Sequence, residues 1–147
     1  MTKGHDIVET SLMSMEYNGS LIDVEKTAKT DLDNGRLVVR DGNTYKYPTD
    51  STATELFLVT TPEKTYENVG LTEFYNKKDR KVRVVRVPVG DKFGTTAFVG
   101  TVAVGDVLMV DNQGQLVAKA ATPAVEFTVR SKRIIGGFEG VIVERTK

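Results

Sequence analysis

The sequence predicts a mainly β protein, a small β-barrel or β-sandwich (β-tulip-like) with a meander of short strands and an extended N-terminal arm. Valine and threonine make up about a quarter of the chain, and such β-branched side chains suit a pleated sheet. Turn signals at short spacing divide the chain from Gly35 onward into runs of strand length. No segment after Gly35 shows a three-turn amphipathic helical pattern. These observations favour packed layers of short strands or one barrel.

The clearest element is a hairpin in V-A-V-G-D-V-L-M-V-D-N-Q-G-Q-L-V-A-K, which runs from Val102 to Lys119. A first Val-rich strand leads into a tight reversal at Asp111–Gly114, and Gln115–Lys119 forms the returning strand. The V-G-D triplet at residues 104–106 repeats an earlier one at residues 89–91. The second half of the chain is therefore predicted to be a meander whose strands are entered through Gly-Asp corners.

The other strands follow from apolar runs between turn signals. Asp-Gly within Asp41–Asn43 is a strong hairpin signal between two β-rich runs. The run E-L-F-L-V-T-T at Glu55–Thr61 is predicted to be a central strand because it is almost continuously apolar or β-branched. We assign residues 35–147 to a single β domain. Its further expected strands are residues 36–40, 44–47, 81–88, 93–99, 125–130 and 141–145.

Residues 1–34 form an N-terminal segment of different composition, rich in Ser, Thr, Asp, Glu and Lys with scattered apolar positions. Met13, Met15 and Tyr17 alternate with other residues, which is typical of an extended strand. We interpret the segment as an arm that is extended or becomes ordered on a partner; an ordinary first hairpin of the domain is the alternative. Its candidate partner-binding residues are Leu12, Met13, Met15, Tyr17, Leu21 and Ile22.

Composition limits the classes of partner. The 20 basic and 20 acidic residues cancel, which argues against a partner attracted by bulk charge, such as duplex DNA or an anionic membrane. The chain has no cysteine, so disulfides and thiolate chemistry are excluded, which fits folding in a reducing cytosol. The N-terminus lacks the apolar core of a secretory signal, and no run reaches the roughly 18 apolar residues of a spanning helix. We therefore expect a soluble protein with no membrane partner.

No residue pattern indicates catalysis, a cofactor or a metal. The single histidine, His5, has no neighbouring set of metal ligands or triad partners in the sequence. Asp31 and Asp33 resemble a fragment of a calcium loop without its closing Glu, so a turn or cap is expected there. Gly136 and Gly137 lie between predicted strands, which favours a chain reversal over a phosphate loop. We expect a protein that is not an enzyme.

Two basic clusters suggest an alternative function. They comprise the basic residues within residues 77–86 and those within residues 130–133. If both lay on one barrel face with Phe74, Tyr75 or Phe93, they could follow the backbone of single-stranded nucleic acid while the aromatic rings stack on bases. The competing interpretation is a solvated edge, because lysine on exposed strands blocks unwanted pairing. A nucleic-acid partner is disfavoured by the interspersed acidic residues and the zero net charge.

Beginning at Val87, three runs resemble the head decoration, or capsid cement, proteins of tailed bacteriophages. They are V-P-V-G-D-K-F, then F-V-G-T-V-A-V-G-D-V-L-M-V-D-N-Q-G-Q-L-V, and G-G-F-E-G-V-I-V-E-R-T near the C-terminus. The resemblance covers about the last 60 residues and rests on a style of strand and turn. It implies a non-catalytic β protein that binds the outer surface of a capsid, commonly as a trimer.

The same resemblance implies the partners and the location. The partners would be the major capsid protein of a tailed phage and further copies of the chain, as a homotrimer. The protein would be made in the cytoplasm of the host bacterium and would end on the capsid surface of the virion. Family members often have an N-terminal arm that becomes ordered on the shell, and residues 1–34 match that role. In that role the arm would add a strand to a sheet edge of the shell.

Overall fold

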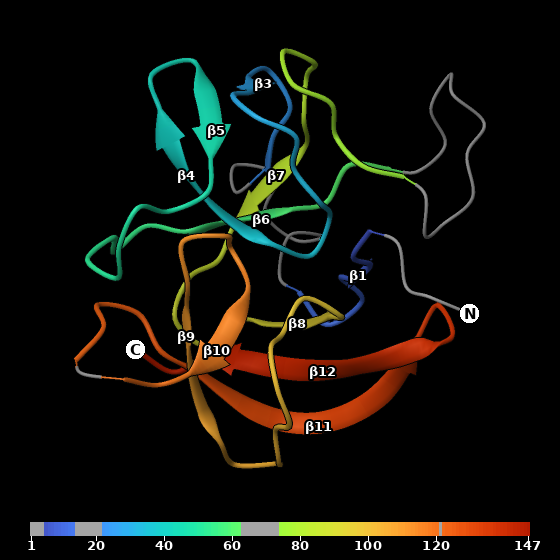
Figure 1. Ribbon diagram of the computed structural model, residues 1–147, viewed down its shortest axis with the longest axis vertical. Helices are drawn as coiled ribbons and strands as arrows, with labels where there is room; N and C mark the ends of the chain where they lie inside the picture. The colour runs from blue at the N-terminus through green and yellow to red at the C-terminus, as the bar shows by residue number, and fades with distance from the viewer. Residues whose placement is uncertain (1–4, 14–21, 63–73, 121) are drawn as a thin grey trace.

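The computed structural model describes residues 5–13, 22–62, 74–120 and 122–147, and these residues form twelve β-strands and no helix (Figure 1). The prediction of a mainly β protein is confirmed. The strands are β1 (Val8–Glu9), β2 (Ile22–Asp23), β3 (Thr27–Ala28), β4 (Leu37–Asp41), β5 (Thr44–Lys46), β6 (Phe57–Val59), β7 (Val84–Arg86), β8 (Lys92–Thr95), β9 (Val107–Val110), β10 (Leu116–Ala118), β11 (Phe127–Ile135) and β12 (Phe138–Arg145).

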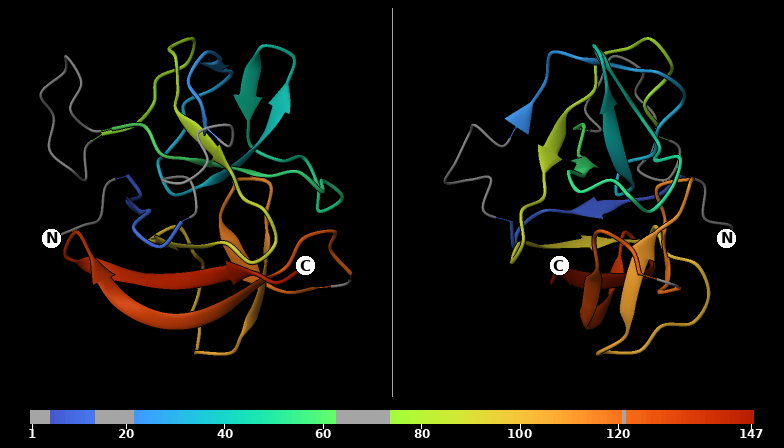
Figure 2. Two further views of the ribbon diagram at one scale, coloured as in Figure 1. Left: turned by 180° about the vertical axis from the view of Figure 1, so that it is seen from behind. Right: turned by 90° about the vertical axis from the view of Figure 1, so that its left-hand side faces the viewer.

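The strands form two sheets that lie one above the other in Figures 1 and 2, as in a β-sandwich. The lower sheet has the order β1-β8-β12-β11-β9-β10, and the upper sheet has the order β2-β7-β6-β4-β5-β3. The pairs are antiparallel except for β3 and β5, which are parallel. Of the two architectures predicted, the sandwich is therefore the one that fits, because the strands do not close into a single barrel.

The predicted hairpins appear with the expected turns. Strands β9 and β10 pair on either side of Asp111–Gly114, with Val110 opposite Leu116. Strands β4 and β5 pair around the Asp-Gly turn, in which Gly42 has a φ of 59°. The reversal expected at Gly136 and Gly137 joins β11 to β12, and both glycines have positive φ, as a two-residue type I′ turn requires.

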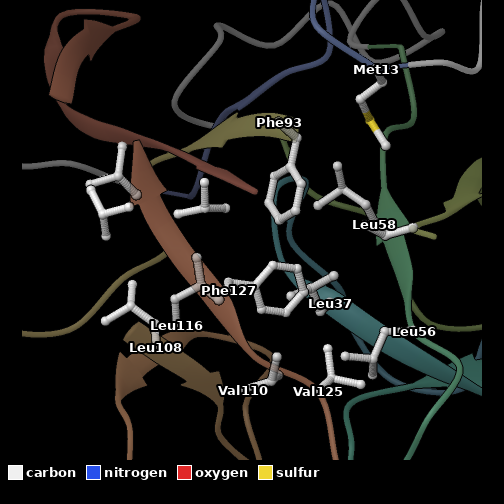
Figure 3. Packing of buried hydrophobic residues seen from close by; sticks show 14 of the residues in the cluster. Met13, Leu37, Leu56, Leu58, Phe93, Leu108, Val110, Leu116, Val125 and Phe127 are labelled. Carbon is white, nitrogen blue, oxygen red and sulfur yellow. The ribbon is translucent and has the colours of Figure 1, made fainter. Parts of the chain in front are cut away.

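The larger hydrophobic core lies between the two sheets (Figure 3). The lower sheet contributes Phe93 and Phe127, whose rings meet edge to face with centroids 5.7 Å apart. The upper sheet contributes Leu37 and Leu58, which are fully buried. Because each sheet supplies large side chains to the same core, neither sheet can keep its apolar face from water without the other.

A second, smaller core covers the other face of the upper sheet. Its buried members are Ala28, Leu32, Val38, Tyr45, Phe57, Val59, Val82 and Val84. Strand β6 is buried along its whole length because its side chains reach both cores. A strand that is buried on both faces has an unbroken apolar sequence, which explains the run on which the central-strand prediction rested.

Candidate functional site

The six candidate residues of the N-terminal segment do not share one environment. Leu12 is 53% exposed, whereas Met13 is 3% exposed and packs in the larger core. Ile22 is half-buried in β2, where it lies opposite Val85 of β7. Met15, Tyr17 and Leu21 lie outside the residues that the structure describes. Leu12 is therefore the described candidate that can meet a partner without any rearrangement of the chain.

The described part of the N-terminal segment belongs to both sheets. Strand β1 adds to the edge of β8, with Val8 opposite Thr95. Strand β2 adds to β7, and β3 adds to β5 in the smaller core. Residues 22–34 thus pair with strands that follow them in the chain. In this conformation these residues complete the body of the protein, and their role as an arm on a partner stays a prediction.

A polar cluster fastens the N-terminal segment to the rest of the molecule, and it centres on Asp6, which is 2% exposed. One carboxylate oxygen of Asp6 accepts a hydrogen bond from Arg36 Nε at 2.8 Å, and the other accepts one from Thr96 Oγ1 at 3.0 Å. The backbone N–H of Asp6 donates to Asp33 Oδ2 at 3.0 Å. A buried carboxylate is tolerable only when its oxygens are satisfied in this way, so Asp6 holds residues from three parts of the chain together.

His5 belongs to the same cluster. Its Nδ1 lies 2.6 Å from Asp33 Oδ1, and its ring stacks on Tyr75 with centroids 4.4 Å apart. The backbone N–H of Asp33 donates to the Tyr47 hydroxyl at 2.9 Å, and burial raises the pKa of Tyr47. Within the described residues, no group of three or more His, Cys, Asp or Glu side chains could hold a metal ion. The contacts of His5 and Asp33 link the N-terminal segment to the upper sheet.

Asp23 makes a second polar anchor for the N-terminal segment. Its Oδ2 accepts hydrogen bonds from Lys26 Nζ and from the Tyr45 hydroxyl, both at 2.7 Å, and its Oδ1 accepts one from the Glu25 backbone N–H at 2.9 Å. Burial by itself would raise the pKa of Asp23. The three hydrogen bonds and the Lys26 charge outweigh burial and lower this pKa to about 2.

The two V-G-D triplets form two corners with the same geometry, the first at residues 88–91 and the second at residues 103–106. In each corner the aspartate N–H closes the turn on the carbonyl three residues earlier, at 3.2 Å in the first and 3.0 Å in the second. The glycine has a φ of 94° in both corners. Positive φ at the third position is the mark of a type II turn and favours glycine there.

Each corner also makes the same backbone hydrogen bonds to a long strand. Gly90 N donates to Arg145 O at 2.8 Å, and Gly105 N donates to Val129 O at 2.8 Å. In the reverse direction, Arg145 N donates to Asp91 O at 3.0 Å, and Val129 N donates to Asp106 O at 2.9 Å. Val89 and Val104, at the tips, are both 63% exposed. The repeat seen in the sequence is therefore a repeated structural unit that starts β8 against β12 and β9 against β11.

The two basic clusters lie on different sheets. Residues 77–86 lead into and form β7 of the upper sheet, whereas residues 130–133 belong to β11 of the lower sheet. Several of their cations form ion pairs, among them Lys81 with Glu25, Arg86 with Glu55, Arg130 with Glu144, Lys132 with Glu139 and Arg133 with Glu9. These glutamates therefore offset part of the positive charge.

The aromatic residues expected beside these clusters are largely occupied. Phe93 is fully buried and Phe74 is 4% exposed, so neither ring is open to a base. Tyr75 stacks on His5. A hollow near residue 77 does combine aromatic and basic side chains. It is lined by Thr61, Phe74, Tyr75, Asn76, Lys77, Arg80 and Lys81.

Comparison with known proteins places the chain in a family. The model of a family described as YonC prophage protein matches residues 6–129. The chain belongs to the YonC prophage protein family. The YonC match runs from β1 to the beginning of β11 and crosses residue 34, so it includes Asp6 with its partners and both corners. Neither the curated proteins nor the solved structures gave a match to this chain.

Family membership confirms the broader part of the sequence-based inference, namely that the protein is phage-derived. The described residues of this YonC-family protein contain no helix that is long and apolar enough to cross a membrane. The polar cluster was not predicted. The sequence shows Asp6, Arg36 and Thr96 only as scattered polar residues, because their contacts depend on the tertiary fold.

Proposed function

We propose that this YonC-family protein is a non-catalytic structural component of a phage particle that binds the outer surface of the capsid and stabilises it. The observation that carries the proposal is the repeated corner unit in a chain of a prophage family. The runs that resemble head decoration proteins begin at Val87 and build much of the lower sheet, including β8, β9, β10 and β12. The resemblance therefore rests on one coherent structural unit.

The mechanism is adhesion by many copies. A shell presents the same surface hundreds of times, so a weak contact by each copy gains strength when copies are joined, because the second contact forms at high effective concentration. We therefore include in the proposal that the protein acts as a homotrimer. A body with two packed sheets and few exposed apolar side chains would serve as the rigid part of such an assembly.

The contact with the major capsid protein is proposed to include Leu12, because its side chain is 53% exposed and lies next to β1. Met13 is a different case, since it would have to leave the core before it could contact a shell. Burial of a side chain of this size contributes about 2 kcal/mol to stability, which that release would forfeit. The N-terminal segment is thus proposed to bind through Leu12 while its buried residues stay in place.

The test is co-sedimentation of the full chain with capsids of the same phage assembled without it. Leu12→Asp should weaken binding about tenfold or more, because an apolar contact is replaced by a charge that must lose its water. Val24→Asp is the matched control, since Val24 is also an exposed apolar residue of the N-terminal segment at 48% and should bind like the wild type. Deletion of residues 1–30 is unsuitable because it would remove β1, β2 and β3.

Three outcomes would contradict parts of the proposal. Wild-type protein that stays in the supernatant would exclude capsid binding, and Leu12→Asp protein that binds normally would remove Leu12 from the contact. Light scattering that gives the mass of one chain would exclude the trimer. An oligonucleotide gel shift that weakens steeply with salt would favour the nucleic-acid alternative instead.

A further inference from the structure

Strand β11 has a long edge without a neighbour among the described residues. On one side it pairs with β12 from Phe127 to Ile135, with a shift of register at Arg130. On the other side β9 pairs with only its first two residues, and Asp106 and Gly105 extend the contact to Val129. The residues that precede Gly105 turn away from β11 at the second corner. Residues 130–135, about 20 Å of strand, therefore have one side on which no described residue pairs with them.

The hydrogen-bond pattern of the hairpin shows which backbone groups point outward. Ile135 and Phe138 flank the two-residue turn and form its closing pair. Bonded and non-bonded positions alternate in an antiparallel pair, so Ser131, Arg133 and Ile135 direct their N–H and C=O groups toward β12. Lys132 and Ile134 consequently direct theirs away from the hairpin. A strand laid beside β11 would find these four groups ready to pair.

The side chains along this edge are basic and apolar. Arg130, Lys132 and Arg133 supply three positive charges within four residues, and their side chains are 46%, 38% and 48% exposed. Their glutamate partners lie on β12 and β1, on the side of β11 away from the open edge. Such exposed ion pairs contribute little stability. Ile134 is 70% exposed. Cations protect an edge from unwanted pairing, but an exposed isoleucine does the opposite.

These features discriminate between possible occupants of the edge. A second copy paired through the same edge would place cations opposite cations, and like charges across a strand pair are destabilising. An acidic strand would place carboxylates opposite the same cations and an apolar side chain beside Ile134. We infer that the open edge of β11, residues 130–135, accepts an extended acidic segment of another protein as an added β-strand. This inference goes beyond the proposed function, because it requires no capsid.

The test uses the full chain labelled with ¹⁵N and two synthetic ten-residue peptides. In the first, Val-Glu-Glu repeats between terminal Thr residues, so that one register places Val beside Ile134 and Glu opposite both Arg133 and Lys132. The second has Lys in place of Glu. The acidic peptide should shift the amide signals of β11 and slow hydrogen exchange at Lys132 and Ile134. The basic peptide should bind about tenfold more weakly, since several cross-strand charge pairs change sign.

Variants separate backbone pairing from charge. Ile134→Pro removes an outward N–H and should abolish binding, whereas Ile134→Val keeps the N–H and should bind normally. The double variant Lys132→Glu with Arg133→Glu should reverse the preference and bind the basic peptide, which provides a test even if the proline variant does not fold. Equal binding of both peptides, no binding of either, or protection at another strand would overturn the inference. Concentration-dependent shifts at the same amides without peptide would favour a second copy and overturn it as well.

Discussion

Asp6 shows how a single residue decides the position of the N-terminal segment. Its side chain is 2% exposed, so its charge would be costly if Arg36 and Thr96 did not contact both oxygens. The next residue continues the attachment, because Ile7 N donates to the Thr96 hydroxyl at 2.9 Å. Residues 5–7 are therefore fixed by polar contacts that link the two sheets.

Asp23 gives a pH-dependent prediction at the same scale. Its pKa is lowered from an ordinary 3.8 to about 2 in the folded chain. A lowered folded-state pKa stabilises the fold above the unfolded value, and this contribution is lost as pH falls from about 4 to about 2. Its size is on the order of 2 kcal/mol at neutral pH. Asp23→Asn should remove it, so urea midpoints of wild type and variant should differ clearly at pH 6 and converge near pH 2.

The matched control for this experiment is Glu25→Gln. The Glu25 side chain is 78% exposed and pairs with Lys81 at 3.8 Å, a contact of the kind that contributes little. Its urea midpoint should follow that of the wild type at both pH values. If the urea midpoints of the wild type and Asp23→Asn differed by the same amount at low and neutral pH, the assigned role of the carboxylate would be contradicted.

Among the elements, the turns of the two predicted hairpins meet different surroundings. Gly42 in the β4–β5 turn and Gly114 in the β9–β10 turn have φ values of 59° and 73°. A Cβ on Gly42 would meet nothing within 4 Å, whereas one on Gly114 would lie 2.5 Å from Leu37 O and 2.7 Å from a ring carbon of Tyr47. Gly114 O also accepts a hydrogen bond from Leu37 N at 2.9 Å. The second turn thus packs directly on the upper sheet.

This contrast predicts the effect of a methyl group at each turn. Gly42→Ala should cost only the strain of the left-handed backbone, about 1 kcal/mol of the free energy of unfolding. Gly114→Ala should cost about 3 kcal/mol, because the backbone of β4 must also move. Urea unfolding of the two variants measures the difference. Equal losses would mean that the β9–β10 turn does not pack on β4 in solution.

At the scale of the whole molecule, the two sheets depend on one core. Phe93, Phe127 and Val143 of the lower sheet share it with Leu58 and Val85 of the upper sheet. Separation of the sheets would expose all of these side chains at once, which makes partial unfolding unfavourable.

The shared core predicts a single unfolding transition. Amide signals of Val84 in β7 and Val143 in β12 should disappear at the same urea concentration when the full chain is followed by NMR. Two separate midpoints would show that each sheet is stable alone and would divide residues 35–147 into two units.

Most of the turns and the central strand could be predicted from the sequence alone. Asp-Gly, Gly-Gly and the V-G-D triplets identified their turns because positive φ and tight reversals depend on only a few neighbouring residues. The apolar run of β6 identified a central strand for a similar reason. The similarity to phage proteins was also visible in these local patterns, and membership of the YonC prophage family confirms a phage-derived protein.

The position of the N-terminal segment and the open edge of β11 among the described residues depend on the tertiary fold, and local sequence does not predict them. Met13 and Leu12 are neighbours of similar hydrophobicity, yet one lies in the core and the other faces solvent. The contacts of Asp6 with Arg36 and Thr96 join residues that are 30 and 90 positions apart. Burial and long-range hydrogen bonds depend on how the sheets stack, whereas a turn depends on its own backbone.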